Sequence, residues 1–314
     1  MTMTDAGWMR ALGSTGIRVS AIAAGGSSFD GRAERPVDSD PIEPIRAVLH
    51  SPVRTIDTSA AYGAGESERR IGAAISDVGG LPADMIVTTK VAGQAGAFSG
   101  AHVRASIQAS KERLGLSELP LVYLHDPEFH RFEDLTAPGG ALETLVAMRE
   151  SGEIGHLGVA GGFLPELNRY LDTGVFEVVL VHNRWTLVDR SADALIDRAV
   201  GEGVAVVNAA IYGGGILAAP TAGLTTYGYR PAKPAILESV AAMSGACDRF
   251  GVDLASAALQ FSLRDERVSM TVIGLSSASR LEKALSAARE PLPDDLWREL
   301  DDQLAGPESW LDAD

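Results

Sequence analysis

The chain contains little cysteine, and few basic residues relative to its acids. Cys247 is the single cysteine among 314 residues, so an internal disulfide is excluded, which suits a reducing cytoplasm. Lysine and arginine together number 27, against 42 aspartates and glutamates, and the formal net charge is −15. Because nucleic acids and anionic membranes both bind basic surfaces, this balance argues against either as the main partner.

Long apolar runs are also missing. No uninterrupted stretch approaches the length that a helix needs to cross a bilayer, and residues 1–8 lack the apolar core of a signal peptide. We therefore expect a cytoplasmic protein with no membrane partner. Cys247 ends an apolar helical pattern, residues 241–247, which favours a buried inert thiol over a nucleophile.

The sequence also lacks the ligand spacing that is typical of metal sites. His125 and His130 have no carboxylate and histidine cluster with zinc spacing around them, so we predict no metal. A metal-dependent barrel hydrolase, one alternative for this chain, would need such a ligand set.

Strand-like and helix-like segments alternate along the whole chain. The expected strands are residues 19–25, 53–57, 85–90, 121–125, 156–160, 176–181, 204–209 and 270–273. The expected helices are residues 41–50, 66–76, 102–114, 141–151, 164–172, 192–202, 234–250, 254–264, 279–288 and 293–304. Eight strand–helix units with no linker predict one α/β domain over residues 1–314, a closed (β/α)8 barrel with an extra C-terminal helix. Residues 210–232 are too long for a plain connection and suggest a functional flap.

Polar residues follow three consecutive apolar runs of this pattern. Asp57, Lys90 and His125 end the second, third and fourth expected strands, and Tyr62 lies in the loop just beyond Asp57. Each residue taken alone could be an ordinary cap, surface charge or packed side chain. In a barrel, however, the carboxyl ends of the strands meet on one face, where such barrels keep their chemistry. We therefore predict a catalytic group of four residues.

These residue types suit proton transfer at a carbonyl or hydroxyl carbon. Free tyrosine has a pKa near 10, and a neighbouring ammonium such as Lys90 should lower it. Asp57 would hold Lys90 in place and keep it protonated. Neutral His125 could donate a hydrogen bond to the substrate oxygen.

A site of this kind has no electron acceptor, so hydride transfer would need a nicotinamide cofactor. Backbone donors and small residues suited to its phosphates occur near the ends of the strands, and one set leads into a helix whose amino terminus attracts anions. Such glycine runs are also common in plain loops. The candidate cofactor-binding residues are Gly25, Gly26, Tyr212, Gly213, Gly214, Gly215, Gly274, Ser276, Ser277 and Arg280.

Several motifs carry a resemblance to a known family. Residues 56–63 (Ile-Asp-Thr-Ser-Ala-Ala-Tyr-Gly), 66–68, 71–72, 88–90, 152–159 and 272–274 resemble, in order and spacing, the signature of the aldo-keto reductases. The match runs from about residue 12 to residue 288. The resemblance implies the same barrel, a tetrad of Asp57, Tyr62, Lys90 and His125, and a nicotinamide cofactor bound extended at the carboxyl face.

Residues 124–128, 183–189 and 227–232 are similar to the branch that contains D-threo-aldose 1-dehydrogenase (L-fucose dehydrogenase) and pyridoxal 4-dehydrogenase. This similarity favours oxidation of an aldose or sugar-like hemiacetal to a lactone, with Tyr62 as general base. Two alternatives stay open. One is reduction of an aldehyde or ketone with Tyr62 as general acid. The other is a nicotinamide-binding redox sensor with little turnover, like the barrel subunits that accompany potassium channels.

The sequence departs from the family pattern at its expected cofactor contacts. Ala160 and Gly161 stand where family members often have a Ser-Asn pair, and Ala209 stands where an aromatic residue often stacks on the nicotinamide. His182 and Asn183 occupy the position where a glutamine commonly contacts the nicotinamide, and Asn183 is expected to make that contact instead. At the adenine end, residues 274 and 275 are Gly-Leu where members that prefer the 2′-phosphorylated cofactor often have Lys-Ser. Arg280 remains, while residues 283 and 284 replace an acid–amide pair. We therefore expect NAD to be preferred over NADP, because charge-assisted bonds to phosphate are the strong ones.

The substrate is expected to be a small sugar or aldehyde. Phe29 and Trp185 are the candidate aromatic residues of its pocket. Nothing in the sequence predicts an oligomeric state.

Overall fold

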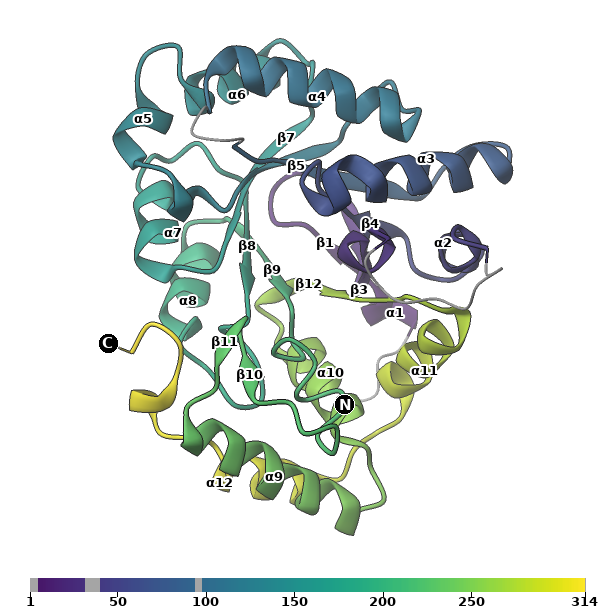
Figure 1. Ribbon diagram of the computed structural model, residues 1–314, viewed down its shortest axis with the longest axis vertical. Helices are drawn as coiled ribbons and strands as arrows, with labels where there is room; N and C mark the ends of the chain where they lie inside the picture. Colours follow the sequence, from purple (N-terminus) through teal and green to yellow (C-terminus); the bar gives the residue numbers. More distant parts are fainter. Residues whose placement is uncertain (1–4, 32–39, 94–97, 314) are drawn as a thin grey trace.

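Eight parallel strands close into a barrel in the computed structural model, which describes residues 5–31, 40–93 and 98–313. The order around the barrel is β12-β3-β4-β5-β6-β7-β8-β9, so each strand pairs with its neighbour in the chain (Figure 1). The strands are β3 (Ile22–Gly25), β4 (Thr55–Asp57), β5 (Ile86–Val91), β6 (Leu121–His125), β7 (His156–Gly161), β8 (Val178–His182), β9 (Ala205–Ala209) and β12 (Val268–Ile273). The predicted (β/α)8 fold is confirmed.

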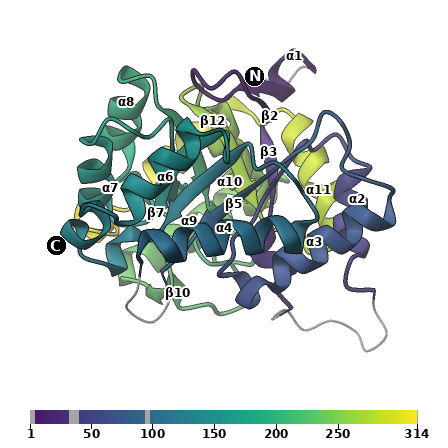
Figure 2. The same cartoon turned by 90° about the horizontal axis from the view of Figure 1, so that it is seen from above.

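Helices surround the strands as the sequence periodicity predicts (Figures 1 and 2). The principal ones are α2 (Glu43–Leu49), α3 (Glu66–Asp77), α4 (Gly100–Leu114), α6 (Ala141–Glu150), α7 (Leu164–Leu171), α8 (Asp193–Gly201), α9 (Pro234–Arg249), α10 (Leu254–Arg264), α11 (Ala278–Arg289) and α12 (Asp294–Asp302). Short elements are α1 (Asp5–Trp8), α5 (Phe132–Thr136) and the 3-10 turns η1 (Gly26–Phe29), η2 (Tyr62–Gly65), η3 (Pro127–Phe129) and η4 (Pro307–Ser309). In the described part of the chain, no helix is long and apolar enough to cross a membrane.

Alternating side chains of the strands build two cores. In β8, Val178 and Leu180 point into the barrel, where they pack with Tyr123 and Met270, whereas the next residues of the strand pack against the helices. This alternation is the period of two that a pleated strand imposes. The inside of the barrel is therefore filled with side chains, and a ligand can bind only at its end.

A β-hairpin closes the amino-terminal end of the barrel. The sequence pattern predicted one strand over residues 19–25, but residues 18–20 form β2 (Arg18–Ser20), which pairs antiparallel with β1 (Met9–Ala11). Leu12 and Val19 are fully buried against the inner core of the barrel. Figure 2 shows α1 and the amino terminus at one end of the molecule and β10 (Thr226–Tyr227) at the other. The open end is thus the carboxyl end of the strands.

The long segment after β9 folds over this open end. Within residues 210–232, β10 pairs with β11 (Arg230–Pro231) in a small hairpin. Tyr227 is buried at its base, where its hydroxyl donates to the carbonyl of Asn183 at 2.7 Å and lies 2.8 Å from Thr186 Oγ1. Elsewhere, Cys247 is fully buried as predicted, and burial raises the pKa of its thiol to about 11.

Candidate active site

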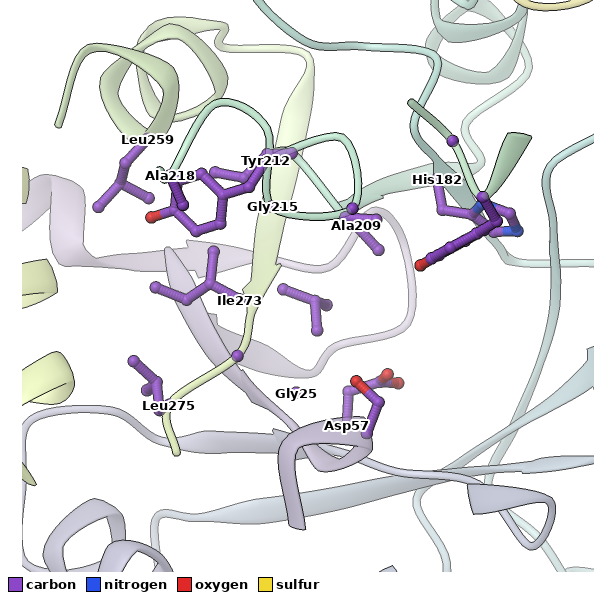
Figure 3. Close-up of a pocket in the computed structure, with 18 of the residues that line it drawn as sticks. Gly25, Asp57, His182, Ala209, Tyr212, Gly215, Ala218, Leu259, Ile273 and Leu275 are labelled. Carbon is purple, nitrogen blue, oxygen red and sulfur yellow. The ribbon is translucent and has the colours of Figure 1, made fainter. Parts of the chain in front are cut away.

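A cavity of about 1520 Å³ opens at the carboxyl end of the barrel. All eight barrel strands contribute to its wall, through Gly25, Asp57, Lys90, His125, Ala160, His182, Ala209 and Ile273. Figure 3 shows Asp57 and His182 on one side of this space, and Leu259 and Leu275 on the other. The volume exceeds the few hundred cubic ångströms of an ordinary small-ligand pocket, so it has room for two molecules at once.

Asp57 and Lys90 form a buried ion pair at the floor of the cavity. The Nζ of Lys90 donates to Asp57 Oδ2 and, at 2.9 Å, to the carbonyl of Thr58. Thr88 Oγ1 donates to the other carboxylate oxygen at 2.8 Å. Burial by itself would lower the pKa of Lys90, but the charge of Asp57 and the contact with Tyr62 outweigh burial, and the pKa is raised. Lys90 is therefore charged at neutral pH, as the sequence argument expected.

Tyr62 lies in η2, against both Lys90 and His125. Its ring centroid is 5.1 Å from Lys90 Nζ and 5.8 Å from the imidazole centroid of His125, with the two rings nearly perpendicular. Burial raises the pKa of Tyr62 more than the charge of Lys90 lowers it, so the net shift is upward. The prediction of a lowered pKa is thus wrong in its net direction, and Tyr62 is a neutral phenol at pH 7.

His125 ends β6 with its ring at the cavity wall. Burial lowers its pKa to about 4, which outweighs the opposing charge of Asp126. The expected neutral imidazole is therefore confirmed. Nδ1 lies 3.1 Å from Ser59 Oγ, and Nε2 lies 3.5 Å from Asp126 Oδ2.

The far end of the cavity contains many of the predicted cofactor residues. Gly25, Tyr212, Gly214, Gly215, Gly274 and Arg280 all line it. The helix α11 begins there, with Ser277 as its cap accepting from the amide of Arg280 at 3.2 Å. Arg280 and Lys283, one turn apart, add positive charge to the positive end of the helix dipole. This donor set suits an extended ligand that carries phosphate groups.

The glycines at this end leave space for such a ligand. A Cβ atom added to Gly214 would meet nothing within 4 Å, and one added to Gly274 would only touch Ser28 at 3.6 Å. Gly26 and Gly213 are different, because a Cβ would come within 2.6 Å of Thr58 Oγ1 or 2.4 Å of the Tyr227 ring. These two glycines permit close packing and do not line the cavity, so a cofactor contact for them stays a prediction.

Three other predicted cofactor residues also lie outside the described cavity wall. Asn183 is fully buried, and its side-chain nitrogen lies 3.0 Å from Nδ1 of His182, which itself lines the cavity. The structure thus places Asn183 behind the wall, where it supports His182. Ser277 is the helix cap, and Ser276 is partly buried beside it.

The two aromatic residues predicted for the substrate pocket belong to the hydrophobic core. Phe29 is fully buried, and Trp185 is 6% exposed and packs on Phe261 with ring centroids 5.4 Å apart. Neither side chain lines the cavity, so the structure lends no support to their predicted contact with the substrate, which stays a prediction. Burying an apolar side chain stabilises the folded state. The sequence placed these two residues in loops, and that position did not indicate that their side chains are buried.

Sequence reasoning missed the polar group beside His125. Asp126, Glu128, His182 and Arg184 line the cavity here, and ligand atoms of the first three all lie within 4.8 Å of one another. The exposed aromatic residues Phe129, Phe163 and Tyr229 surround this end of the cavity. His182 ends β8, so the strand-end rule that found His125 could have found it as well.

The fold and the site define the class of protein, a (β/α)8 barrel with Asp57, Tyr62, Lys90 and His125 grouped in a cavity at the carboxyl end of its strands. Residues 21–305 match the sequence model of the aldo/keto reductase family, and the chain belongs to this family. Its members are oxidoreductases that use nicotinamide cofactors, which fit the extended cavity and the cationic helix start described above.

Characterised relatives support this membership. The chain is 28% identical to a pyridoxal 4-dehydrogenase of Microbacterium luteolum over 93% of its own length and 96% of that protein. It is 26% identical to a D-threo-aldose 1-dehydrogenase of a Pseudomonas species, over 92% and 95% of the two chains. Among solved structures, a glycerol dehydrogenase from Gluconobacter oxydans has the same fold, with a TM-score of 0.76 at 19% identity and coverage of 96% and 97%.

Proposed function

We propose that this protein is an NAD-linked dehydrogenase that oxidises an aldose or a sugar-like hemiacetal to a lactone. The observation that carries the proposal is the group of Tyr62, Lys90 and His125 around one point of the cavity wall, with Asp57 buried behind Lys90. The bound nicotinamide ring would accept the hydride from the hemiacetal carbon.

Each of the four residues has a separate task in this reaction. Tyr62 takes the proton of the hydroxyl that is being oxidised. Lys90 stabilises the phenolate form of Tyr62, and Asp57 keeps Lys90 charged and in place. His125, neutral because it is buried, donates a hydrogen bond that orients the reacting oxygen.

The polar group beside His125 favours a polyhydroxylated substrate. Asp126 and Glu128 line the cavity, and neither Asp126 Oδ1 nor Glu128 Oε2 accepts a hydrogen bond in the described part of the chain, although Nε2 of His182 lies 3.8 Å from Asp126 Oδ1. Ionised carboxylates only accept hydrogen bonds, so we expect these side chains to bind donors, which sugar hydroxyls supply and a simple aldehyde does not. The printed activity of the D-threo-aldose relative points to the same substrate class.

The adenine end supports the preference for NAD. Leu275 is buried there, next to Gly274, where the family pattern for NADP has a lysine and a serine. Arg280 and Lys283 supply positive charge, but Glu290 and Asp253 line the same cavity, and the charges of Asp253 and Arg280 both act on Tyr212. We expect a higher kcat/KM with NAD than with NADP on the same substrate, and a clear preference for NADP would contradict this assignment.

A second function, reduction of an aldehyde or ketone, is favoured by one observation. The raised pKa of Tyr62 keeps its proton at neutral pH, which is the form that a general acid requires. Both directions use the same residues, and rates measured in each direction distinguish them.

A substrate panel with a Tyr62→Phe variant tests the proposal. Aldoses, pyridoxal and simple aldehydes are offered with NAD or NADP, or with the reduced cofactors, and the change in nicotinamide absorbance is followed. We expect the highest rate for oxidation of an aldose with NAD, and a loss of at least about 100-fold in Tyr62→Phe, because that variant has no proton to exchange. Tyr170→Phe is the matched control, since Tyr170 is buried in the outer core, away from the cavity.

Two results would contradict the proposal. Full activity of Tyr62→Phe on the best substrate would remove the assigned base. Rapid turnover of simple aldehydes with no turnover of any aldose would exclude the sugar substrate.

A further inference from the structure

Ser59 lies between Asp57 and Tyr62 in the sequence, and its side chain packs behind His125. Its side chain is fully buried and does not line the cavity. Its hydroxyl oxygen lies 3.1 Å from Nδ1 of His125 and accepts the backbone N–H of Ala61, also at 3.1 Å. Its carbonyl accepts the backbone N–H of Tyr62 at 3.1 Å. One residue is thus bonded both to the loop that carries Tyr62 and to the imidazole of His125.

The direction of the Ser59–His125 hydrogen bond follows from counting protons. The Ala61 amide can only donate, so it leaves the hydroxyl proton of Ser59 unused. A buried hydroxyl needs an acceptor for that proton. Within the described part of the chain, Nδ1 of His125 is the acceptor that lies in reach. A neutral imidazole that accepts at Nδ1 carries its hydrogen on Nε2.

The opposite side of the imidazole leads to the same assignment. Nε2 of His125 lies 3.5 Å from Oδ2 of Asp126, which as a carboxylate can only accept. The other tautomer would set the lone pair of Nε2 against this carboxylate, and would leave the Ser59 proton without an acceptor. Both neighbours therefore favour a hydrogen on Nε2.

We propose that Ser59 is a positioning residue that fixes His125 as its Nε2–H tautomer and links the ring to the Tyr62 loop. The contact of Nε2 with Asp126 Oδ2, at 3.5 Å, is too long for a strong hydrogen bond, so the Nε2–H can donate to a substrate oxygen in the cavity. The ring centroids of His125 and Tyr62 lie 5.8 Å apart. The phenol and the imidazole can thus address the same substrate oxygen without reorienting, which is the geometry that preorganised catalysis requires. The kinetic part of this inference rests on the proposed function, whereas the tautomer is a property of the protein alone.

Nitrogen-15 NMR of histidine-labelled wild-type protein at pH 7 measures the tautomer directly. The His125 resonances are assigned by their loss in His125→Gln. We expect a protonated Nε2 and an unprotonated Nδ1. A proton on Nδ1, or a rapidly averaged mixture of both tautomers, would overturn the inference. This measurement needs no substrate, so it stands even if the proposed reaction proves wrong.

Kinetics of two Ser59 variants test the positioning role. We expect Ser59→Ala to lower kcat about ten-fold with a smaller change in KM, because the imidazole loses the bond that orients it. Ser59→Thr keeps the hydroxyl and should stay within about three-fold of wild type. Ser67→Ala is the matched control: Ser67 is equally buried and bonds to Thr58 and Gly26 of the same region, but not to His125.

Unchanged kcat in Ser59→Ala, or an equal loss in Ser67→Ala, would overturn the positioning role. If Ser59→Ala does not fold, the wild-type NMR spectrum and Ser59→Thr still decide the question. Wild-type protein without turnover of any aldose would refute the proposed function and leave the tautomer to the NMR result.

Discussion

Tyr62 and His125 share one cavity wall, and burial shifts their pKa values in opposite directions. Burial disfavours the charged form of any group, so it raises the pKa of the phenol and lowers that of the imidazole. The pKa of Lys90 is raised although the group is buried, because Asp57 and Tyr62 together more than offset the effect of burial on its charge. The site therefore keeps one buried ion pair beside two neutral donors.

These shifts predict how the rate depends on pH at the scale of single residues. In the proposed reaction, oxidation needs the phenolate of Tyr62, and the phenolate fraction grows about ten-fold per pH unit below the raised pKa. Oxidation should therefore speed up continuously from pH 7 to pH 10, whereas reduction should stay level near neutrality and fall at high pH. His125, with a pKa of about 4, should add no inflection between pH 5 and pH 8. Profiles of log kcat/KM in both directions check this, and a shared midpoint near pH 6.5 would contradict the neutral imidazole.

The sequence pattern located some residues of the cavity wall and placed there others that lie outside it. Asp57, Lys90 and His125 were found because strand ends in a barrel must converge, whatever the side chains are. Whether a residue such as Phe29 or Gly26 lines the cavity depends on which side chain fills the space around it. That side chain can come from a distant part of the sequence. The net pKa of Tyr62 also depends on burial, which the sequence pattern did not show.

At the scale of elements, the contact between α3 and α4 explains a glycine of the family motif. Gly72 lies inside α3, where a Cβ atom would come within 2.2 Å of the backbone carbonyl of Arg113 at the end of α4. The glycine lets the two helices approach closely. The positions of strands and helices could be predicted because each depends on the local spacing of apolar residues. The division of residues 19–25 into two strands could not, because it depends on the pairing of β2 with β1.

Gly72→Ala should therefore destabilise the protein even though alanine is the better helix former. We expect a loss of about 1–3 kcal/mol in the free energy of unfolding, since the added methyl group meets backbone that cannot easily move. Gly245→Ala in α9 is the control: its Cβ would meet only Arg249 Nη1, at 3.9 Å, and it should stabilise by about 0.5–1 kcal/mol. Urea denaturation of both variants measures the difference. Equal shifts in the same direction would show that the helix contact is not limiting.

At the scale of the whole molecule, the C-terminal segment is held against the cavity wall. Asp312 accepts two hydrogen bonds from Arg184, at 3.0 and 2.9 Å, and both side chains are almost completely buried. The backbone N–H of Leu311 donates to Asp189 at 2.7 Å. Because Arg184 lines the cavity, the end of the chain helps to shape the site from 128 residues away. Local sequence patterns do not report contacts over such a separation.

Removing this contact should be costly for the fold. Asp312→Ala leaves the buried guanidinium of Arg184 without its carboxylate, so we expect a loss of about 3–5 kcal/mol in the free energy of unfolding. Asp301→Ala breaks the exposed ion pair with Arg190 and should cost only about 0–1 kcal/mol. Chemical denaturation, read by tryptophan fluorescence, compares the two. A loss in Asp312→Ala no larger than in Asp301→Ala would show that the tail is not held as described.

The proposed reaction is hydride transfer from a sugar carbon at the open end of the barrel, beside Tyr62, Lys90 and His125. An aldose deuterated at its hemiacetal carbon tests this claim most directly. Incubated with the protein and NAD, it should yield reduced cofactor that carries the deuterium, a lactone product, and a slower turnover than the unlabelled sugar, with all three lost in Tyr62→Phe. Reduced cofactor without deuterium, or no reduction of NAD by any aldose, would contradict the account.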